Sequence, residues 1–559
     1  MFPLLLAAIL QPISIDLVGQ QQWVPTRLEA VPFVATVGSR PDAPAIRLTA
    51  PALPESKPWL SAYSATLKTP RDGSTVVFEA YLRSPDRHKI EIRMGEWVDG
   101  WLHLTHAWQR YRLVGRVPEQ TESPRLEIWL GDSAGEVDLA DVRVLDLGIQ
   151  ADNSIPELRG DDYEGINSDD WRVTAEERIK RLRMGEFAVT AVDAAGRPVP
   201  ACPVEIVQER SFFRFGTEIG AQSILDNDPT SLRLREELLQ RFNTVTLGNE
   251  LKWMNSDAFS SALATLPWIR AQHLALRGHT LVWGSFHYSP HNLAGRTPTE
   301  LRTALHEHLR EYVDKLGDDV YAWDVVNEAV WEHDFWDAVG WAEFPEAFRE
   351  VRRLNPRVLL AYNDFVQHRD MEPQGYASWR ARVQQLTDAN APFDLLGDQC
   401  HMEPPFIPVG RLLQRWDDMA RLGRRLEITE FDVSTPDDKL QATYLRDFLT
   451  AAFSQPAIDG VILWGFYEGR MWKSQGALFR QDWTPRPALA AFDDLVLRDW
   501  RTRARLVTDT SGHIAVPAFF GTYLVTIHTP NGDRSAEIEH TPDHLARVVF
   551  RLPGISRQP

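Results

Sequence analysis

Cysteine is scarce in this chain: Cys202 and Cys400 are the two among 559 residues. Two cysteines do not make the disulfide framework of a small secreted scaffold, and neither has companions at the spacing of a zinc site. Disulfides and structural zinc are therefore excluded as the basis of the fold. Because the two cysteines fall in segments that we assign to different domains, we expect both to be free thiols.

Basic charge and long apolar runs are also in short supply. The chain has 60 lysines and arginines against 78 aspartates and glutamates, a formal net charge of −18. This balance argues against nucleic acid as a partner, since a phosphate backbone requires a basic surface. No basic run favours an anionic membrane, and we expect no membrane span. Phe2–Leu10 has the length of a signal-peptide core without a positive flank, so we treat residues 1–19 as a candidate leader segment.

What remains is an ordinary globular composition, with 43% hydrophobic and 25% charged residues. The length predicts two to four folding units, each able to bury a core. Tryptophan is heavily used, at 20 residues against 12 tyrosines. Flat rings can stack on the apolar faces of sugars, so this usage favours carbohydrate, although most tryptophans in any protein serve packing.

Residues 20–150 are predicted to form a β-sandwich. Short alternating strands separated by turn residues are expected at Val76–Arg83, Lys89–Met94, Gln109–Val114, Arg125–Leu130 and Asp141–Leu145. Through Ala107–Tyr111 and Val137–Val142 the stretch resembles a jelly-roll carbohydrate-binding module. Its tryptophans are candidates for a sugar platform, with core or edge packing as the commoner role for any one of them: Trp97, Trp101, Trp108 and Trp129.

Residues 151–211 are predicted to be a connection made of an acidic linker, a helix and a β-hairpin. The helix is expected at Ser168–Arg183, with acidic residues early and basic residues late, as the helix dipole prefers. The hairpin is expected from Glu186–Val192 and Val204–Glu209, around the turn residues 194–198. After the barrel described next, residues 499–559 return to short strands and predict a small β-domain: Arg505–Thr508, His513–Pro517, Gly521–His528, Ala536–Glu539 and Ala546–Leu552.

Between residues 212 and 498 strands alternate with amphipathic helices such as Thr299–Lys315 and Leu440–Phe453. Eight strand–helix units predict a central (β/α)8 TIM barrel, so the chain is expected to be multi-domain. The eight candidate strands are Arg214–Gly220, Phe242–Asn249, Leu276–Trp283, Tyr321–Glu328, Val358–Asp364, Asp394–His401, Arg425–Val433 and Gly460–Tyr467.

Two of these strands deliver a glutamate near the C-terminal end, where such barrels place catalysis: Glu328 and Glu430. A carboxylate at the end of an apolar strand is costly to bury unless it is paired or used. Two together suggest an acid/base and a nucleophile at one glycosidic bond, the apparatus of a retaining glycosidase. The alternative is that both are structural acids in ion pairs. Further candidates also end or follow predicted strands: Asn249, Lys252, His279, Trp283, Asn327, Gln399, His401, Asp432, Trp464 and Trp472.

The barrel resembles glycoside hydrolase family 10, the endo-β-1,4-xylanase family, over residues 212–497. The likeness runs through ordered motifs: Phe242–Thr246, Asn249–Trp253, Arg277–Trp283, Trp323–Glu328, Asn363–Phe365, Gln399–His401, Ile428–Asp432, Trp464-Gly465 and Pro485–Ala488. On weaker grounds the flanking β-segments resemble the plant-like branch of that family.

The resemblance implies a role for each candidate. Glu328 would be the acid/base and Glu430 the nucleophile of a double displacement without metal or cofactor. Asn327 would hold the 2-hydroxyl of the reacting sugar, while His401, oriented by Asp432, would keep Glu430 ionised. The other candidates would bind sugar, Asn249 and Lys252 on the non-reducing side and the rest around the central subsite: His279, Trp283, Gln399, Trp464 and Trp472.

Some positions depart from the family pattern. Gly248 stands where the family usually has glutamate, Gly284-Ser285-Phe286 replaces His-Ser-Gln, and Phe365 replaces a frequent tyrosine. The loss at Gly248 removes a hydrogen-bond acceptor from the subsite two sugars from the cut. We therefore expect a retained mechanism with a weaker or altered grip on substrate, to be tested by restoring the acceptor with Gly248→Glu.

The favoured hypothesis is a secreted or periplasmic, monomeric endo-xylanase acting on xylan or a related β-glycan. Export is inferred mainly from the substrate, since polymeric xylan lies outside cells. Two alternatives stay open: the same chemistry on another β-glycan or in transglycosylation, and a carbohydrate-binding protein whose barrel no longer turns over. A substrate panel separates the first from xylanase activity, and retention on xylan without cleavage identifies the second.

Overall fold

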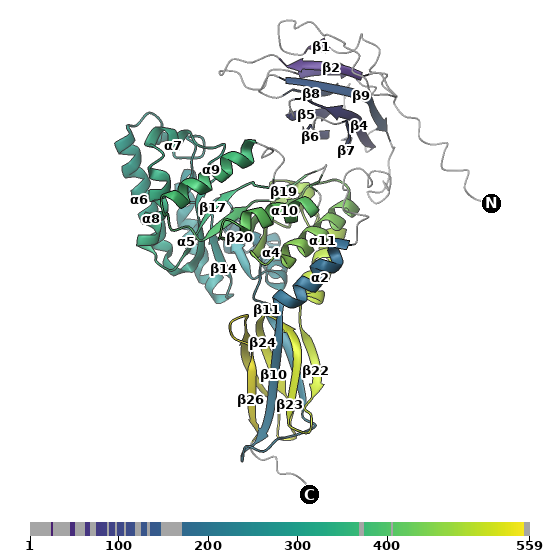
Figure 1. Cartoon of the computed structure of the whole chain (residues 1–559), viewed down its shortest axis with the longest axis vertical. Coiled ribbons are helices and arrows are strands. Elements are labelled where there is room, and N and C mark those ends of the chain that lie inside the picture. The colour runs from purple at the N-terminus through teal and green to yellow at the C-terminus, as the bar shows by residue number, and fades with distance from the viewer. Residues whose placement is uncertain are drawn as a thin grey trace, which may run out of the picture. The chain divides into compact units, whose positions relative to one another are not determined.

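Parallel strands close into a barrel in the computed structural model of this chain (Figure 1). The structure describes residues 170–552 apart from 368–373, 404, 405 and 408. Before residue 170 it describes 24–25, 45–50, 62–66, 74–85, 89–94, 98–104, 108–117, 125–130 and 135–146. The candidate leader and the acidic linker lie outside these residues. The chain divides into two compact units, the first built on residues up to Asn167 and the second on most of the residues from Ser168 onward.

The first unit contains two antiparallel sheets that share one hydrophobic core, which confirms the expected sandwich of strands. Leu48, Phe78 and Leu139 from one sheet and Ile90 and Leu126 from the other are buried together. One sheet has the order β1 (Val24–Pro25), β3 (Ala62–Thr66), β8 (Arg125–Trp129), β5 (Lys89–Met94) and β6 (Val98–His103). The other has the order β2 (Ala45–Ala50), β9 (Gly135–Asp146), β4 (Thr75–Arg83) and β7 (Gln109–Arg116).

Two of the tryptophans considered for a sugar platform carry an arginine on the ring face. The guanidinium of Arg93 lies 5.2 Å from the ring centroid of Trp129, and that of Arg83 lies 4.7 Å from that of Trp108. A face covered by a guanidinium is not open to a sugar. Trp97 and the side chain of Trp101 lie outside the described residues.

The barrel follows the strand–helix alternation read from the sequence, and all eight predicted strands are present. Going round the barrel, the order is β14 (Ala275–Gly278), β13 (Thr244–Thr246), β12 (Arg214–Glu218), β21 (Ile458–Leu463), β20 (Arg425–Val433), β18 (Leu395–Asp398), β17 (Leu359–Asp364) and β16 (Val320–Asn327). Pairing of β14 with β16 closes the ring. The short strands β15 (Val282–Trp283) and β19 (His401–Met402) extend it beside β16 and β20.

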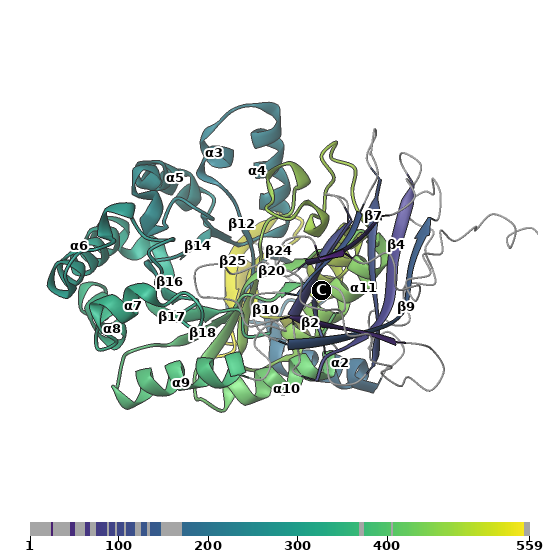
Figure 2. The same cartoon turned by 90° about the horizontal axis from the view of Figure 1, so that it is seen from above.

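Helices surround these strands, as the view from above shows (Figure 2). They are α3 (Ala221–Leu225), α4 (Pro229–Arg241), α5 (Phe259–Ala271), α6 (Pro298–Leu316), α7 (Asp334–Val339), α8 (Glu343–Leu354), α9 (Gln374–Asp388), α10 (Val409–Ala420), α11 (Asp438–Ser454) and α12 (Pro487–Asp493). In α6 a capping box of Thr297 and Glu300 satisfies the first backbone N–H groups, and leucines on one face are buried against the barrel. No helix among the described residues is long and apolar enough to cross a membrane.

The predicted hairpin before the barrel is wrong. Its first strand, β10 (Met184–Asp193), pairs with β23 (His513–Phe519) and β26 (Arg547–Leu552). Its second, β11 (Pro203–Ser211), pairs with β22 (Arg503–Val507) and β24 (Gly521–Ile527), which pairs with β25 (Arg534–His540). The turn itself forms, with Gly196 at φ 80° and the Asp193 carboxylate accepting from Ala195 N and Arg197 N. It carries the chain from one sheet to the other instead of folding it back.

The reason lies in side-chain burial. Phe187 and Val189 of β10 and Ile206 of β11 are buried in the same core with Val525 and Phe550, so the two strands face each other across a sandwich (Figure 1). The helix α2 (Asp170–Arg183), close to its predicted limits, precedes β10. Its Arg183 donates to the carbonyls of Phe453, Gln455 and Ile458 at the foot of the barrel.

A buried ionic cluster lies inside the barrel. The fully buried Arg277 of β14 donates to Asp324 of β16 and to Glu427 of β20, and Tyr321 donates to Glu427 with an O–O distance of 2.9 Å. Three strands are thereby joined through one guanidinium. Both acids are buried, so the guanidinium between them offsets part of the cost of burying their charges.

Replacing Arg277 with leucine is expected to lower the free energy of unfolding of the barrel by about 3–5 kcal/mol, because Asp324 and Glu427 lose the buried guanidinium that both contact. The partners that remain are weaker: Arg214 lies 3.7 Å from Glu427, and His279 lies 3.0 Å from Asp324. Denaturant titration followed by tryptophan fluorescence measures the change. Arg277→Lys, which keeps the charge but loses the planar fork, is expected to cost less. An unchanged midpoint in Arg277→Leu would show that the cluster contributes nothing to stability.

Candidate functional site

Glu328 follows directly on the last residue of β16, at the C-terminal end of the barrel. Its backbone has φ 53°, a left-handed conformation that is uncommon for residues other than glycine and is found often at functional sites. Its amide donates to the carbonyl of Asn363 at 2.9 Å. The carboxyl accepts from Gln399 Nε2 at 2.7 Å and from Trp283 Nε1 at 3.1 Å. Two strands besides its own therefore fix the direction of this side chain.

Glu430 lies in β20, 5% exposed, with its carboxylate among basic groups. Its Oε2 lies 3.5 Å from His401 Nε2, and its Oε1 lies 3.8 Å from His279 Nδ1. Asn363 Nδ2 donates to Oε1 at 2.9 Å. The positive charge of the Lys252 ammonium also lowers the pKa of Glu430. This environment favours the ionised form of the acid.

The surroundings of the two glutamates shift their pKa values in opposite directions. Burial raises the pKa of Glu328 to about 7; the Gln399 hydrogen bond opposes this rise and the charge of Glu430 adds to it. Burial alone would also raise the pKa of Glu430, but His279, His401 and Lys252 outweigh it and lower the pKa to about 2. At pH 5, one group is a proton donor and the other an anion. Such a divergence in one site assigns acid and anion roles.

A chain of amides joins the two acids. Asn327 Nδ2 donates to Glu328 Oε1 at 3.2 Å, and Asn327 Oδ1 accepts from Asn363 Nδ2 at 2.8 Å. Asn363 donates to Glu430 as well, while its Oδ1 accepts from Thr429 at 2.7 Å. Asn363 belongs to one of the motifs shared with the family, but the motif alone predicted no role for it. Its position as the penultimate residue of a barrel strand was the available signal.

His401 connects Glu430 to a second carboxylate. Its Nδ1 lies 2.8 Å from Asp432 Oδ2, and Trp472 Nε1 donates to the same oxygen at 2.9 Å. Burial lowers the pKa of His401, but Asp432 and Glu430 outweigh it and raise the pKa to about 9. The imidazolium therefore persists at neutral pH beside Glu430.

The remaining predicted residues lie around the same two acids. Lys252 Nζ donates to the exposed Asn249 at 3.1 Å and lies 5.2 Å from the ring centroid of Trp283, which stacks on Tyr288. Burial lowers the pKa of Lys252, against the carboxylates around it. His279 lies 3.0 Å from Asp324, the acid that also accepts from Arg277.

Two indoles lie on the side of the site formed by β21 and the loop after it. Trp464 meets His279 edge to face, with centroids 5.2 Å apart. Trp472 is 57% exposed and lies 4.7 Å from the ring of His401. The Lys473 ammonium lies 4.4 Å from the ring centroid of Trp472, so this indole, anchored at its N–H, can offer a ligand only the face without the cation.

The expected gap at Gly248 is not there. A Cβ placed on Gly248 would lie 2.8 Å from Cδ and 2.9 Å from Cγ of Glu218, and closer still to its Oε1. A carboxyl from the neighbouring strand therefore occupies the space, and the expectation of a lost acceptor is corrected. Gly284 is likewise required by packing, because its Cβ would collide with the indole of the buried Trp336.

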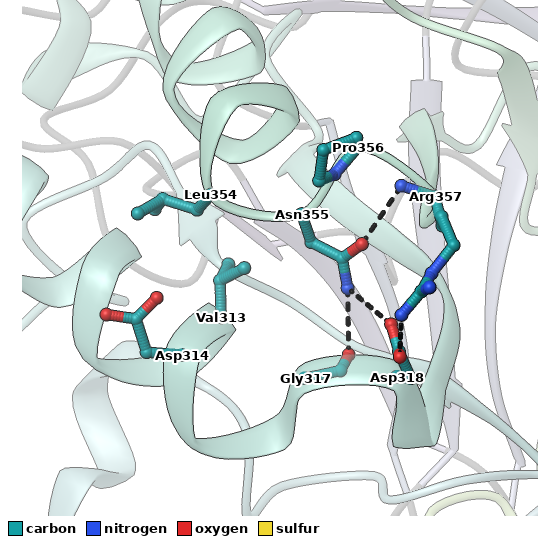
Figure 3. A pocket seen from close by; sticks show the side chains of 8 residues that line it. All are labelled: Val313, Asp314, Gly317, Asp318, Leu354, Asn355, Pro356 and Arg357. Carbon is teal, nitrogen blue, oxygen red and sulfur yellow. Dashed lines mark hydrogen bonds and ion pairs between the residues drawn. The ribbon is translucent and has the colours of Figure 1, made fainter.

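Both cysteines are free and buried, as expected. Among the described residues no group of three or more His, Cys, Asp or Glu side chains could hold a metal ion. A pocket lies between the C-terminal ends of α6 and α8, lined by Asp314, Asp318, Asn355 and Arg357 among others (Figure 3). Its lining residues come just before β16 and β17 begin, so the pocket lies at the N-terminal end of the barrel strands, opposite the glutamates. Asn355 there donates to the Gly317 carbonyl at 3.0 Å, which ties two connections together.

Comparison with known proteins gives a family match over the barrel and the strand before it. The model of glycosyl hydrolase family 10 matches residues 204–495. The anti-sigma-I factor RsgI6 of Acetivibrio thermocellus is 27% identical over 367 residues, which are 64% of this chain and 47% of that protein. Endo-1,4-beta-xylanase 1 of Arabidopsis thaliana is 24% identical over 338 residues, 59% of this chain and 35% of that protein. The chain thus spans about half or less of the length of these relatives.

Among solved structures, xylanase 10B from Thermotoga petrophila in complex with xylobiose aligns with 23% identity and a TM-score of 0.47. The alignment covers 52% of this chain and 95% of that one.

Proposed function

Because the chain belongs to glycosyl hydrolase family 10, we propose that it is an endo-acting glycosidase that cleaves β-1,4-xylosidic bonds with retention of configuration. The observation that carries the proposal is the divergence of the two glutamates, with the pKa of Glu328 near 7 and that of Glu430 near 2. A retaining glycosidase needs one acid protonated and the other ionised around one bond.

The proposed reaction has two displacements. Ionised Glu430 attacks the anomeric carbon while Glu328 gives its proton to the glycosidic oxygen, so the bond to the leaving sugar breaks and a glycosyl-enzyme ester forms. Glu328, now a carboxylate, then takes a proton from water. The oxygen of that water attacks the same carbon and releases Glu430. Each step inverts the configuration, and the two together retain it.

The supporting residues act through position and charge. His401, held by Asp432, and His279 keep Glu430 ionised and aimed, and Gln399 and Trp283 fix Glu328. Asn327, whose amide donates to Glu328 and accepts from Asn363, holds the 2-hydroxyl of the reacting sugar. A hydrogen bond there strengthens as charge develops on the ring.

We assign sugar binding to the other residues around the two acids. Asn249 and Lys252 serve the non-reducing side, and Trp464 and Trp472 supply aromatic walls around the reacting sugar. The substrate is xylan or a related β-glycan, which places the protein outside the cytoplasm, in the periplasm or beyond. The N-terminal sandwich is assigned to carbohydrate binding on its likeness to a jelly-roll module.

Incubation with β-1,4-xylan tests the function directly. We expect release of reducing ends from within the polymer, with the β-anomer as the first product by proton NMR, because double displacement retains configuration. An α-anomer as first product would contradict the retaining mechanism. Absence of new reducing ends from a folded protein that is retained on xylan would instead support the binding protein.

The pH profile follows from the two pKa values. Glu430 must be ionised, so kcat/KM is expected to be lost only as the pH falls towards about 2. Glu328 must be protonated, so kcat/KM falls about tenfold per pH unit as the pH rises through about 7. Initial rates on an aryl β-xylobioside between pH 4 and 9 would show the alkaline limb. A limb centred below pH 5 would contradict the raised pKa of Glu328.

A further inference from the structure

Glu218 ends β12 and lies beside Gly248, one of the positions that depart from the family pattern. Strands β12 and β13 pair in parallel with Glu218 opposite Thr246, two residues before Gly248. The Glu218 side chain passes so closely over Gly248 that a Cβ would fit there only if this side chain moved. Its Oε2 lies 3.6 Å from where a Cβ on Gly465 would stand, in the connection after β21. Gly248 therefore leaves room for this carboxyl, whereas a Cβ on Gly465 would only touch it.

The Glu218 carboxyl has no structural role among the described residues. Among the residues that the structure describes, none donates a hydrogen bond to it or forms an ion pair with it, and it is only partly exposed. The neighbouring acid Glu250 is used differently, because it accepts from the amides of Ala221 at 2.8 Å and Asn249 at 3.3 Å. The Glu218 oxygens are not among the fully buried atoms that lack a partner, so solvent reaches them and a ligand can take the place of that water.

The charges that reach Glu218 are those of the proposed active site. Burial raises the pKa of Glu218 to about 8; Glu250 and Glu430 add to the rise, and Lys252 opposes it. At neutral pH the group is thus a carboxylic acid with one O–H donor and one carbonyl acceptor. A neutral acid does not repel the nucleophile Glu430. It can also donate to one hydroxyl of a vicinal diol and accept from the next.

We propose that Glu218 is a specificity-determining residue of the glycone side, where its carboxyl binds adjacent hydroxyls of the sugar two positions from the cleaved bond. The proposal rests on the proposed function and adds a residue that the family pattern does not predict. The acidic group that is absent at position 248 is supplied instead by Glu218 on the neighbouring strand. Glu218 and Gly248 are then an interdependent pair, since a side chain at 248 would displace the Glu218 carboxyl from its present position.

The test compares two aryl substrates, p-nitrophenyl β-xyloside, which fills one glycone position, and p-nitrophenyl β-xylobioside, which fills two. In Glu218→Ala the preference for the xylobioside, as a ratio of kcat/KM values, is expected to fall about 10- to 100-fold. Glu218→Gln, which keeps one donor and one acceptor, is expected to stay within about threefold of the native ratio. An unchanged ratio in Glu218→Ala overturns the proposal, as does a Gln variant as poor as the Ala variant.

The double variant Glu218→Ala/Gly248→Glu separates recognition from packing. It returns a carboxyl to the same space from the other strand and is expected to recover most of the lost preference. Gly248→Glu alone is expected to lower the melting temperature, because its side chain collides with Glu218. A swap that folds like the native protein but recovers no preference also overturns the proposal.

A binding readout keeps failure of this proposal distinct from failure of the proposed function. Calorimetric titration with xylotriose in the Glu430→Ala background needs no turnover. There Glu218→Ala is expected to weaken binding about tenfold or more. If native protein cleaves neither aryl substrate, the proposed function fails, and the titration alone decides on Glu218. Equal affinity with and without the Glu218 carboxyl overturns the proposal in that case too.

Discussion

Glu430→Ala is expected to lower kcat/KM on xylan by about 10⁴- to 10⁶-fold, because the covalent intermediate can no longer form. The residue is ionised, nearly buried and surrounded by His279, His401 and Lys252, and nothing else in the site can replace its carboxylate. Reducing-end release from β-1,4-xylan measures the loss. The vacated space faces the anomeric carbon, so azide is expected to restore cleavage of an aryl xylobioside and to give the α-azide.

The control for this variant is Glu307→Gln on the exposed face of α6, which removes a solvent-exposed carboxylate from the helices around the barrel and is expected to keep native activity. Near-native turnover in Glu430→Ala would contradict the assignment of the nucleophile. Inactivity of the native protein and the variant alike, with both retained on xylan, would favour a barrel that binds without cleaving.

Glu328→Ala is expected to lower kcat/KM on xylan by about 10³- to 10⁴-fold, because the sugar leaving group then departs without a proton. The loss should depend on the leaving group. With a dinitrophenyl β-xylobioside, which needs no proton, the first step should stay fast and produce a burst, while hydrolysis of the intermediate becomes slow for lack of a base. The alkaline limb of the pH profile set by the Glu328 pKa near 7 should disappear.

Stopped-flow release of dinitrophenol measures the burst. The same drop on xylan and on the dinitrophenyl substrate would contradict the acid/base role and would point to a disturbed fold. Melting temperature provides the check on folding. Gln399→Ala serves as a companion variant, because it removes the hydrogen bond that opposes protonation of Glu328 and is expected to move the alkaline limb upward.

The barrel could be predicted because each of its strands is a local signal. Apolar, β-branched runs such as Arg425–Val433 carry polar residues in their C-terminal halves, and helices of the right length lie between them. Strand count and order therefore follow without tertiary information. The position of both glutamates followed as well, since parallel strands bring their C-terminal ends to one edge. The motifs then assigned roles to residues such as His401 that spacing alone would have left open.

What the sequence could not reveal depends on contacts between distant segments. The turn around Gly196 looks like a hairpin, and only strands hundreds of residues later decide that β10 and β11 belong to opposite sheets. Gly248 suggested the loss of a hydrogen-bond acceptor, because the sequence cannot show that the side chain of Glu218 from β12 fills the space beside it. Asn363 links the two acids through side-chain geometry that no motif expresses.

The route of the chain through the C-terminal sandwich has a consequence for biosynthesis. Strands β10 and β11 are made before the barrel, and their partners β22, β23, β24 and β26 are made after it. The barrel is thus an insertion within the sandwich. On the ribosome β10 and β11 must wait, with unpaired edges, until the whole barrel has emerged, and any interruption of translation before β26 leaves them exposed to aggregation. Once closed, the sandwich joins the two ends of the barrel segment and would hold them together even if the barrel opened transiently.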